Sequence, residues 1–162
     1  MTARSRDDHG PAIHIEIGEP TDAGRRVLQC SWPTRPDVRE GILAEIGRTL
    51  TIPGWVSDQD HSWLRLCLDE ALANAMYHGN EGDPRLSVEV AVFINAERWT
   101  VHIADQGVGF SAAVVPGHQR PEDLEREHGR GIRLMLEWLD QLTYWRGGRL
   151  IALSRQRADG TI

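Results

Sequence analysis

Alternating hydrophobic residues in the middle of the chain impose the strongest constraint on its fold. Every second residue is apolar from 86 to 94, and the alternation returns from Trp99 to Ile103 after a short polar turn. A period of two places these side chains on one face of a strand. The two stretches therefore predict an antiparallel hairpin that ends at Asp105 and a glycine-rich loop.

Three amphipathic helices are expected around this hairpin. Apolar residues recur at helical spacing over 38–50 and 132–139. Between them in sequence, a longer helix is predicted from a cap at Ser57 or Asp58 to about His78, where glycines stop it. On that helix, two polar residues lie beside one another at the margin of the apolar face.

Shorter apolar runs predict further strands at both ends of the sequence, over 13–17, 26–32, 142–145 and 150–153. The segment 111–128 is rich in charge, proline and glycine, and it is longer than most loops in compact domains. We expect this segment to be a mobile lid.

Length and charge limit the organisation and partners of the chain. A length of 162 residues predicts a single domain over residues 12–156, with flexible tails at 1–11 and 157–162. The net charge is −6, from 18 basic and 24 acidic residues. No stretch concentrates positive charge, so neither direct binding to nucleic acid nor binding to an anionic membrane is expected.

The types of residue used exclude several classes of site. All 18 basic residues are arginine, which excludes a Schiff-base lysine and the lysine of the Walker phosphate loop. Cys30 and Cys67 lie far apart, and Cys67 falls on an apolar helical face, so a buried free thiol is predicted rather than a disulfide. No apolar run reaches the roughly 18 residues of a membrane span. A cytoplasmic location is expected.

Three short segments carry the groups suited to binding a nucleotide. Residues 70–79 read Glu-Ala-Leu-Ala-Asn-Ala-Met-Tyr-His-Gly, 105–110 read Asp-Gln-Gly-Val-Gly-Phe, and 128–132 read His-Gly-Arg-Gly-Ile. None matches a standard nucleotide fingerprint. In this order and spacing they resemble the N, G1 and G2 boxes of the GHKL superfamily, which contains gyrase, the histidine kinases and the MutL proteins. The resemblance covers about residues 60–155, and the first box looks most like the RsbW-type anti-sigma serine kinases.

The resemblance implies ATP and Mg²⁺ as ligands and gives roles to three polar residues. Asn74 would help to hold Mg²⁺ through its amide oxygen, and Glu70 would be the catalytic base that orients or deprotonates an attacking hydroxyl. Asp105 would accept a hydrogen bond from the adenine amino group. Without the resemblance, Glu70 and Asn74 could equally be polar residues at a helix boundary, and Asp105 could belong to a common Asp-x-Gly turn.

Six further nucleotide-binding residues are implied: His78, Gly107, Gly109, Gly129, Arg130 and Gly131. Glycines allow close approach of the backbone, and the start of a helix favours phosphate through its free N–H groups. Two of these residues have simpler alternatives. Arg130 could be an exposed charge beside a glycine turn, and His78 could serve only the carbonyls at the end of its helix.

The implied fold is the Bergerat type of α/β two-layer sandwich, with a mixed, mainly antiparallel sheet covered by helices on one face. The implied activity is that of a Mg-ATP-dependent serine/threonine-protein kinase. It would act as an anti-sigma factor, phosphorylate an anti-anti-sigma partner of the STAS type and form a homodimer.

One departure from the family pattern leaves two other functions open. Where the final hairpin of the family commonly carries Gly-Thr, this chain has Arg149 after two glycines. A nucleotide-binding partner-switch module without kinase activity is therefore one alternative. A detached histidine-kinase catalytic domain is the other, although no dimerising helix with a phosphoacceptor histidine precedes the first box.

Overall fold

The computed structural model describes residues 13–110, 117–120, 124 and 131–158. Its fully described helices are α1 (Arg39–Thr51), α2 (His61–Ala73) and α4 (Gly131–Trp138). The strands are β1 (Ile13–Ile15), β2 (Arg25–Pro33), β3 (Ser87–Ile94), β4 (Arg98–Ala104), β5 (Gly117–Gln119), β6 (Gln141–Trp145) and β7 (Leu150–Gln156). Short helical turns are η1 (Pro36–Val38), η2 (Asp58–Asp60), η3 (Asn74–Gly79) and η4 (Arg146–Gly148). None of these helices is long and apolar enough to cross a membrane.

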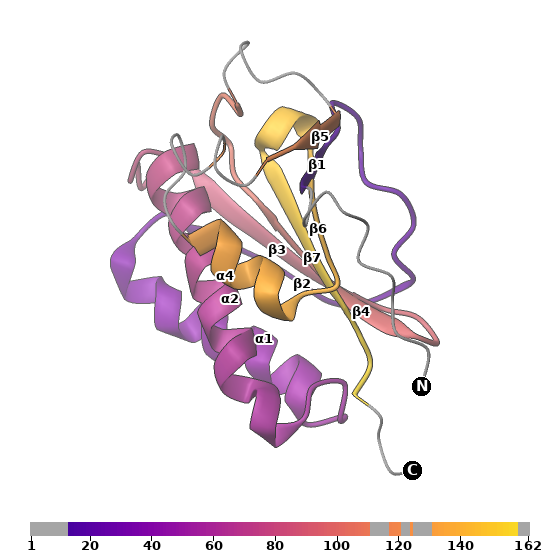
Figure 1. The fold of residues 1–162 in the computed structure, drawn as a ribbon. Coiled ribbons are helices and arrows are strands. Elements are labelled where there is room, and N and C mark those ends of the chain that lie inside the picture. The colour runs from indigo at the N-terminus through magenta and orange to yellow at the C-terminus, as the bar shows by residue number, and fades with distance from the viewer. Residues whose placement is uncertain (1–12, 111–116, 121–123, 125–130, 159–162) are drawn as a thin grey trace.

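The described strands form a single sheet with the order β2-β3-β4-β7-β6-β1-β5. All neighbouring pairs are antiparallel except β1 and β6, which are parallel. Figure 1 shows α1, α2 and α4 on the same face of this sheet. This arrangement confirms the predicted α/β fold, a mixed and mainly antiparallel sheet with helices on one face.

The hydrophobic core lies between the helices and the covered face of the sheet. Most of its members follow the predicted periods: the residues at four-residue spacing in α1 and every second residue of β3 are buried, whereas in β4 all residues from 99 to 104 are buried. The side chains from these three elements are Ile42, Ile46, Leu50, Val88, Val90, Val92, Trp99, Val101 and Ile103. Full burial of each large apolar side chain contributes about 1.5–3 kcal/mol.

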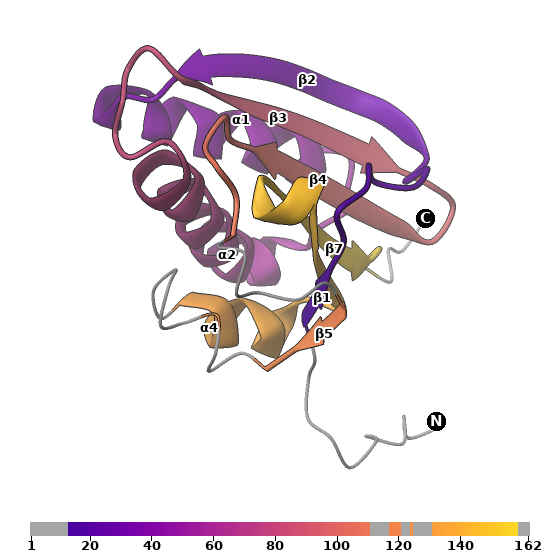
Figure 2. The same cartoon turned by 90° about the horizontal axis from the view of Figure 1, so that it is seen from above.

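The segment predicted to be a mobile lid contains a strand. β5 pairs with β1 in antiparallel register, from Ile13 opposite Gln119 to Ile15 opposite Gly117, and Figure 2 shows the two strands side by side. Without β5, the outer edge of β1 would leave backbone groups unpaired. Leu124 is also buried in the core. These residues thus carry a strand and a core contact where the sequence predicted only a loop, and the rest of 111–128 lies outside the described residues.

The first strand and the residues after β7 differ from the sequence predictions. The first strand stops at Ile15, and Ile17 is exposed, because the carbonyls of Glu16 and Gly18 accept hydrogen bonds from the turn that follows β6. At the other end, the backbone N–H of Arg157 donates to Glu97 and that of Ala158 to Trp55. The chain is therefore still bonded at these two residues, where a loose tail was expected.

The helix predicted to reach His78 changes its form before that residue. α2 ends at Ala73, and Asn74–Gly79 forms a π-helical turn instead of α-helix. In agreement with this wider turn, the N–H of Asn80 donates to the carbonyl of Ala75 at 2.9 Å. Single π-helical turns of this kind occur often at functional sites.

Asn80 holds this turn against the sheet. The residue is fully buried, and its side-chain amide donates to Thr34 Oγ1 at 2.8 Å and to the carbonyl of Ser87 at 2.9 Å. Its Oδ1 accepts the backbone N–H of Gln106 at 2.8 Å. One side chain therefore joins the end of the helix, the start of β3 and the loop that follows β4, and these distant contacts account for the widened turn.

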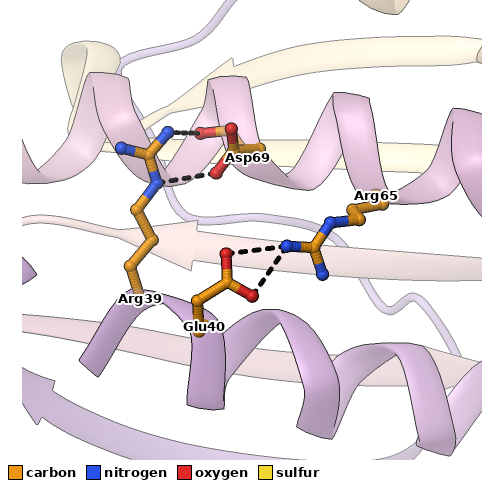
Figure 3. A network of polar contacts seen from close by, with 4 residues as sticks. All are labelled: Arg39, Glu40, Arg65 and Asp69. Carbon is orange, nitrogen blue, oxygen red and sulfur yellow. Dashed lines mark hydrogen bonds and ion pairs between the residues drawn. The ribbon is translucent and has the colours of Figure 1, made fainter. Parts of the chain in front are cut away.

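Ion pairs join α1 and α2 on their outer surface, as Figure 3 shows. Arg39 of α1 donates to Asp69 of α2 at 2.6 Å, and Arg65 of α2 donates to both carboxylate oxygens of Glu40 at 2.7 Å. Partly exposed pairs of this kind contribute about 0–1 kcal/mol each. They align the two helices, while the core supplies most of the stability.

Replacement of Asn80 by Ala should destabilise the protein by about 3 kcal/mol, because the three hydrogen bonds of this buried side chain, of about 1 kcal/mol each, are lost. For a chain of this size the melting temperature should fall by roughly 6 to 12 °C, measured by calorimetry. The exposed Gln59→Ala in η2 is the control and should melt within about 2 °C of the unmodified protein. A similarly small shift for Asn80→Ala would contradict its structural role.

Candidate functional site

A cavity lies at the end of α2, between the π-helical turn η3 and the loop that follows β4. Four of the predicted site residues line it: Asn74, His78, Asp105 and Gly109. Its apolar lining comes from Ala71, Ala75, Ile103 and Ile151. Groups from the first two sequence motifs thus meet around one hollow with an apolar lining and a few polar groups, which is the usual composition of a small-molecule site.

Asp105 is the main charged group of this cavity. Its backbone N–H donates to the carbonyl of Arg149 at 2.8 Å, and its Oδ1 accepts the N–H of Gly107 at 2.9 Å. Burial raises the pKa of Asp105 from 3.8 to about 6, although the Gly107 hydrogen bond and the charge of Arg149 act in the opposite direction. Desolvation disfavours the ionised form, so this carboxylate favours a ligand that donates a hydrogen bond.

Two glycines allow the backbone to approach Asp105 closely. A Cβ atom on Gly79 would overlap the Asp105 carboxylate, and one on Gly107 would overlap the carbonyl of Gly79. Gly107 was a predicted site residue, whereas Gly79 was predicted only to end a helix. Gly79 directly follows His78 in the first motif, and this position was the signal that could have identified it as a site residue.

The loop after β4 is fixed on its other side by Gly109. Its φ is +76°, a backbone conformation that disfavours other residues, and a Cβ there would press on the carbonyl of Gly147. The next residue, Phe110, donates its backbone N–H to the same carbonyl at 2.8 Å. The glycine loop is therefore held between the end of the helix and the turn that joins β6 to β7.

Two buried polar atoms of the cavity lining have no hydrogen-bond partner within the described part of the chain. They are Nδ2 of Asn74 and the hydroxyl oxygen of Tyr144. Buried polar groups are nearly always paired, and both of these atoms belong to residues that line the cavity. Burial raises the pKa of Tyr144 well above its usual value, as does the charge of Asp105, so the hydroxyl remains neutral. The sequence placed Tyr144 only within the predicted strand 142–145.

The metal-binding capacity of this region rests on Asn74. Among the described residues, no group of three or more His, Cys, Asp or Glu side chains is placed to hold a metal ion. A single amide on a helix suits a metal such as Mg²⁺, which keeps phosphate and water oxygens as most of its ligands. Asn74 fits that role through its Oδ1 atom, while its amide nitrogen can only donate a hydrogen bond.

Glu70 lies one turn before Asn74 but packs elsewhere. Its carboxylate lies against Gly131, the first residue of α4, where a Cβ would overlap it. Glu70 is half-buried and does not line the cavity. Gly131 is buried, so close packing against Glu70 also favours glycine at this position. The sequence predicted a glycine there for close approach to a nucleotide. Gly129 and Arg130 lie outside the described residues.

The remaining predicted residues lie at the rim. His78 is exposed and lines the cavity. The exposed Arg149 donates from Nε to the carbonyl of Arg146 at 3.1 Å, and its Cγ lies beside Gly109. An arginine therefore borders the glycine loop at the position where the family commonly has threonine.

Replacement of Asp105 by Asn should raise the melting temperature at pH 7.5. The folded-state pKa of about 6 exceeds the ordinary value of 3.8, so the folded state binds this proton more tightly than the unfolded chain does. The resulting stabilisation is complete below pH 3.8 and is lost as the pH rises through 6. Thermal melts should therefore show a gain at pH 7.5 that shrinks towards pH 4. An equal shift at both pH values would contradict the assigned ionisation.

Two comparisons relate the chain to known proteins. Residues 36–155 match the Histidine kinase-like ATPase domain family. Over 85 residues the chain is 31% identical to the Serine/threonine-protein kinase BtrW of Bordetella bronchiseptica, an alignment that covers 51% of this chain and 60% of that protein. The chain thus matches less than two thirds of the length of that relative. Because the family match extends over most of the chain and its fold agrees, the protein belongs to the histidine kinase-like, or GHKL, ATPase family.

Proposed function

We propose that the protein is a Mg-ATP-dependent serine/threonine-protein kinase that acts as an anti-sigma factor and phosphorylates a small anti-anti-sigma partner of the STAS type. Membership of the family implies ATP as the nucleotide, and the similarity to BtrW supports a serine or threonine target. The observation that carries the proposal is the meeting of Asp105 with Asn74 in one cavity.

Adenine recognition follows from the chemistry of Asp105. Its carboxylate accepts hydrogen bonds, and the exocyclic amino group of adenine donates them. Guanine presents a carbonyl at the same position, which would leave two acceptors facing each other. The Tyr144 hydroxyl, a neutral donor without a partner in the described residues, is available to an acceptor on the base or to a bridging water.

Phosphoryl transfer would use the residues at the end of α2. Bound Mg²⁺ neutralises charge on the transferred phosphate, and Asn74 is the residue that would hold it. Glu70 would take the proton from the target hydroxyl as the hydroxyl oxygen bonds to the γ-phosphorus. The bond from that phosphorus to its bridging oxygen breaks, and ADP leaves. Glu70 lies beside the start of α4, where helical N–H groups favour phosphate.

A specific observation favours one alternative, a partner-switch module that binds nucleotide without transferring phosphate. Arg149 stands beside the glycine loop instead of a hydroxyl side chain. A detached histidine-kinase catalytic domain is a third candidate. Incubation with radiolabelled ATP and copurified partners separates the three. Labelled serine or threonine supports the proposal, labelled histidine in a partner supports the third candidate, and persistent absence of label supports the switch module.

We also propose, from the same family resemblance, a cytoplasmic homodimer that binds a sigma factor. Sedimentation analysis of the purified chain tests the assembly, since a monomer at all concentrations would contradict it. Pull-down from the native cell followed by mass spectrometry tests the partner, and it would also identify the target protein.

Replacement of Asn74 by Ala should weaken binding of Mg-ATP, because the proposed metal ligand is lost. Glu70→Gln should keep nucleotide affinity but slow phosphoryl transfer by about 10²–10⁴-fold, the usual contribution of a positioned base. Calorimetry and a transfer assay with the partner measure the two effects. Glu137→Gln, an exposed change on α4, is the matched control. Undiminished transfer by Glu70→Gln would exclude its role as base.

Affinity for ATP should fall when Asp105 is protonated. At pH 5, one unit below its pKa of about 6, only about one-tenth of the carboxyl groups are ionised, so the dissociation constant should rise about tenfold relative to the ionised form. Titrations from pH 5 to 8 in the unmodified protein and in Asp105→Asn test this. Asp105→Asn should bind ATP weakly at every pH, and the part of the pH dependence that arises from Asp105 should be absent. Parallel pH profiles in the two proteins would contradict the proposed contact.

A further inference from the structure

Strands β3 and β4 separate where the chain enters the glycine loop of the nucleotide cavity. Their paired register ends where Glu89 lies opposite Ala104. Continued by two residues, this register would bring Ser87 opposite Gln106. Instead, the backbone N–H of Gln106 donates to Oδ1 of Asn80 at 2.8 Å. The backbone at residue 106 is therefore bonded to the residue that follows the helix and not to β3.

Side chains replace the missing backbone pairing at this point. Oε1 of Gln106 accepts the backbone N–H of Ser87 at 2.6 Å, and the carbonyl of Ser87 accepts a hydrogen bond from Nδ2 of Asn80 at 2.9 Å. Together with the bond from the Gln106 N–H to Asn80, these contacts close a ring of three hydrogen bonds, which we call the Asn80–Ser87–Gln106 ring. Both backbone groups of Ser87 are thus paired without the backbone of β4.

The neighbours of Gln106 on both sides press against the end of the helix. The carboxylate of Asp105 lies where a Cβ on Gly79 would overlap it, and a Cβ on Gly107 would overlap the carbonyl of Gly79. Gly107 also donates its N–H to Oδ1 of Asp105 at 2.9 Å. Gln106 thus lies between the two residues that meet the helix end, and its own bonds tie this stretch to the start of β3.

Exposure separates the contribution of Gln106 from that of Asn80. Asn80 is fully buried, whereas Gln106 is exposed and its bond to Ser87 lies at the surface. Water can pair with the Ser87 N–H when the glutamine oxygen is removed, so the loss of this bond costs little folding free energy. The same loss frees the loop to move back towards the register of β3 and β4. The bond therefore fixes a position more than it stabilises the fold.

We infer that Gln106 is a positioning residue for recognition of the base: its side chain holds the loop so that the Asp105 carboxylate meets the amino group of adenine. This inference rests on the proposed contact between Asp105 and adenine. Gln106 does not line the cavity and acts through the backbone that it shares with Asp105. Hydrogen bonds weaken steeply as their length and angle depart from the optimum, so a small displacement of the carboxylate reduces discrimination between an amino group and a carbonyl.

Binding of two nucleotides tests the position of the carboxylate. ATP carries an amino group on its purine ring and inosine triphosphate carries a carbonyl there, so the ratio of their dissociation constants reports on recognition of this edge of the base. Both are titrated by calorimetry into the full chain with magnesium at pH 8, well above the Asp105 pKa of about 6. Gln106→Met keeps the side-chain length but removes the acceptor. Its preference for ATP should fall by about tenfold or more, as the loss of a hydrogen bond to a charged group does.

Two further variants separate positioning from a general structural effect. Gln106→Glu keeps an oxygen for the Ser87 N–H and should retain the preference for ATP to within about threefold. Gln59→Met makes the same change at an exposed glutamine in η2 and should leave the preference unchanged. Thermal melts of Gln106→Met should stay within about 2 °C of the unmodified protein, because the lost bond is exposed.

The outcomes distinguish failure of this inference from failure of the proposed function. Asp105→Asn should lose the preference for ATP whatever the role of Gln106. If that variant loses the preference while Gln106→Met keeps it to within twofold, the positioning role is overturned and the adenine contact stands. Equal losses in Gln106→Met and Gln106→Glu would also overturn it, since the second variant retains an acceptor. An unmodified protein that does not prefer ATP would overturn the adenine contact itself, and this inference with it.

Discussion

The buried carboxylate of Asp105 is the constraint on which the nucleotide end of the molecule depends. Because it lies against the backbone at the end of the helix, residues 79 and 107 have no room for a side chain. Asn80 fixes the same helix end and the same loop by hydrogen bonds to both sides. Burial disfavours the ionised form of the Asp105 carboxylate, and the contacts of the neighbouring backbone and of Asn80 hold it in place nonetheless. A ligand that donates a hydrogen bond to the carboxylate would offset part of the free energy lost by burying its charge. Binding sites often contain groups that lower the stability of the free protein in this way.

The sequence predicts the elements whose pattern arises from one buried face. The period of β3 and β4 and the four-residue repeat of α1 reflect burial against the same core, so both were visible in the chain. The π-helical turn was not, because it follows from contacts between Asn80 and Thr34, which is 46 residues away in sequence. β5 was missed for a similar reason. Three residues with no alternating pattern become a strand because the edge of β1 needs a partner.

Spacing along a helix does not show which surroundings each side chain meets. Asn74 follows Glu70 by one α-helical turn, since its backbone N–H still donates to the Glu70 carbonyl, yet the two side chains pack in different places. Asn74 lines the cavity, while Glu70 contacts Gly131. Tyr144 falls within a predicted strand, and only the tertiary structure shows that this residue lines the cavity and that its buried hydroxyl has no partner within the described residues.

Helix α4 is fixed at both ends by contacts that its own sequence pattern does not show. Gly131 at its start lies against the Glu70 carboxylate, where a Cβ would overlap. Trp138 at its end is buried, with its ring centroid 5.8 Å from that of Trp99 and 4.4 Å from the Arg155 guanidinium carbon. Eight residues of α-helix span only about 12 Å, so these two contacts together set the position of the whole helix. The residue proposed as the base is therefore positioned by a helix whose other end belongs to the core.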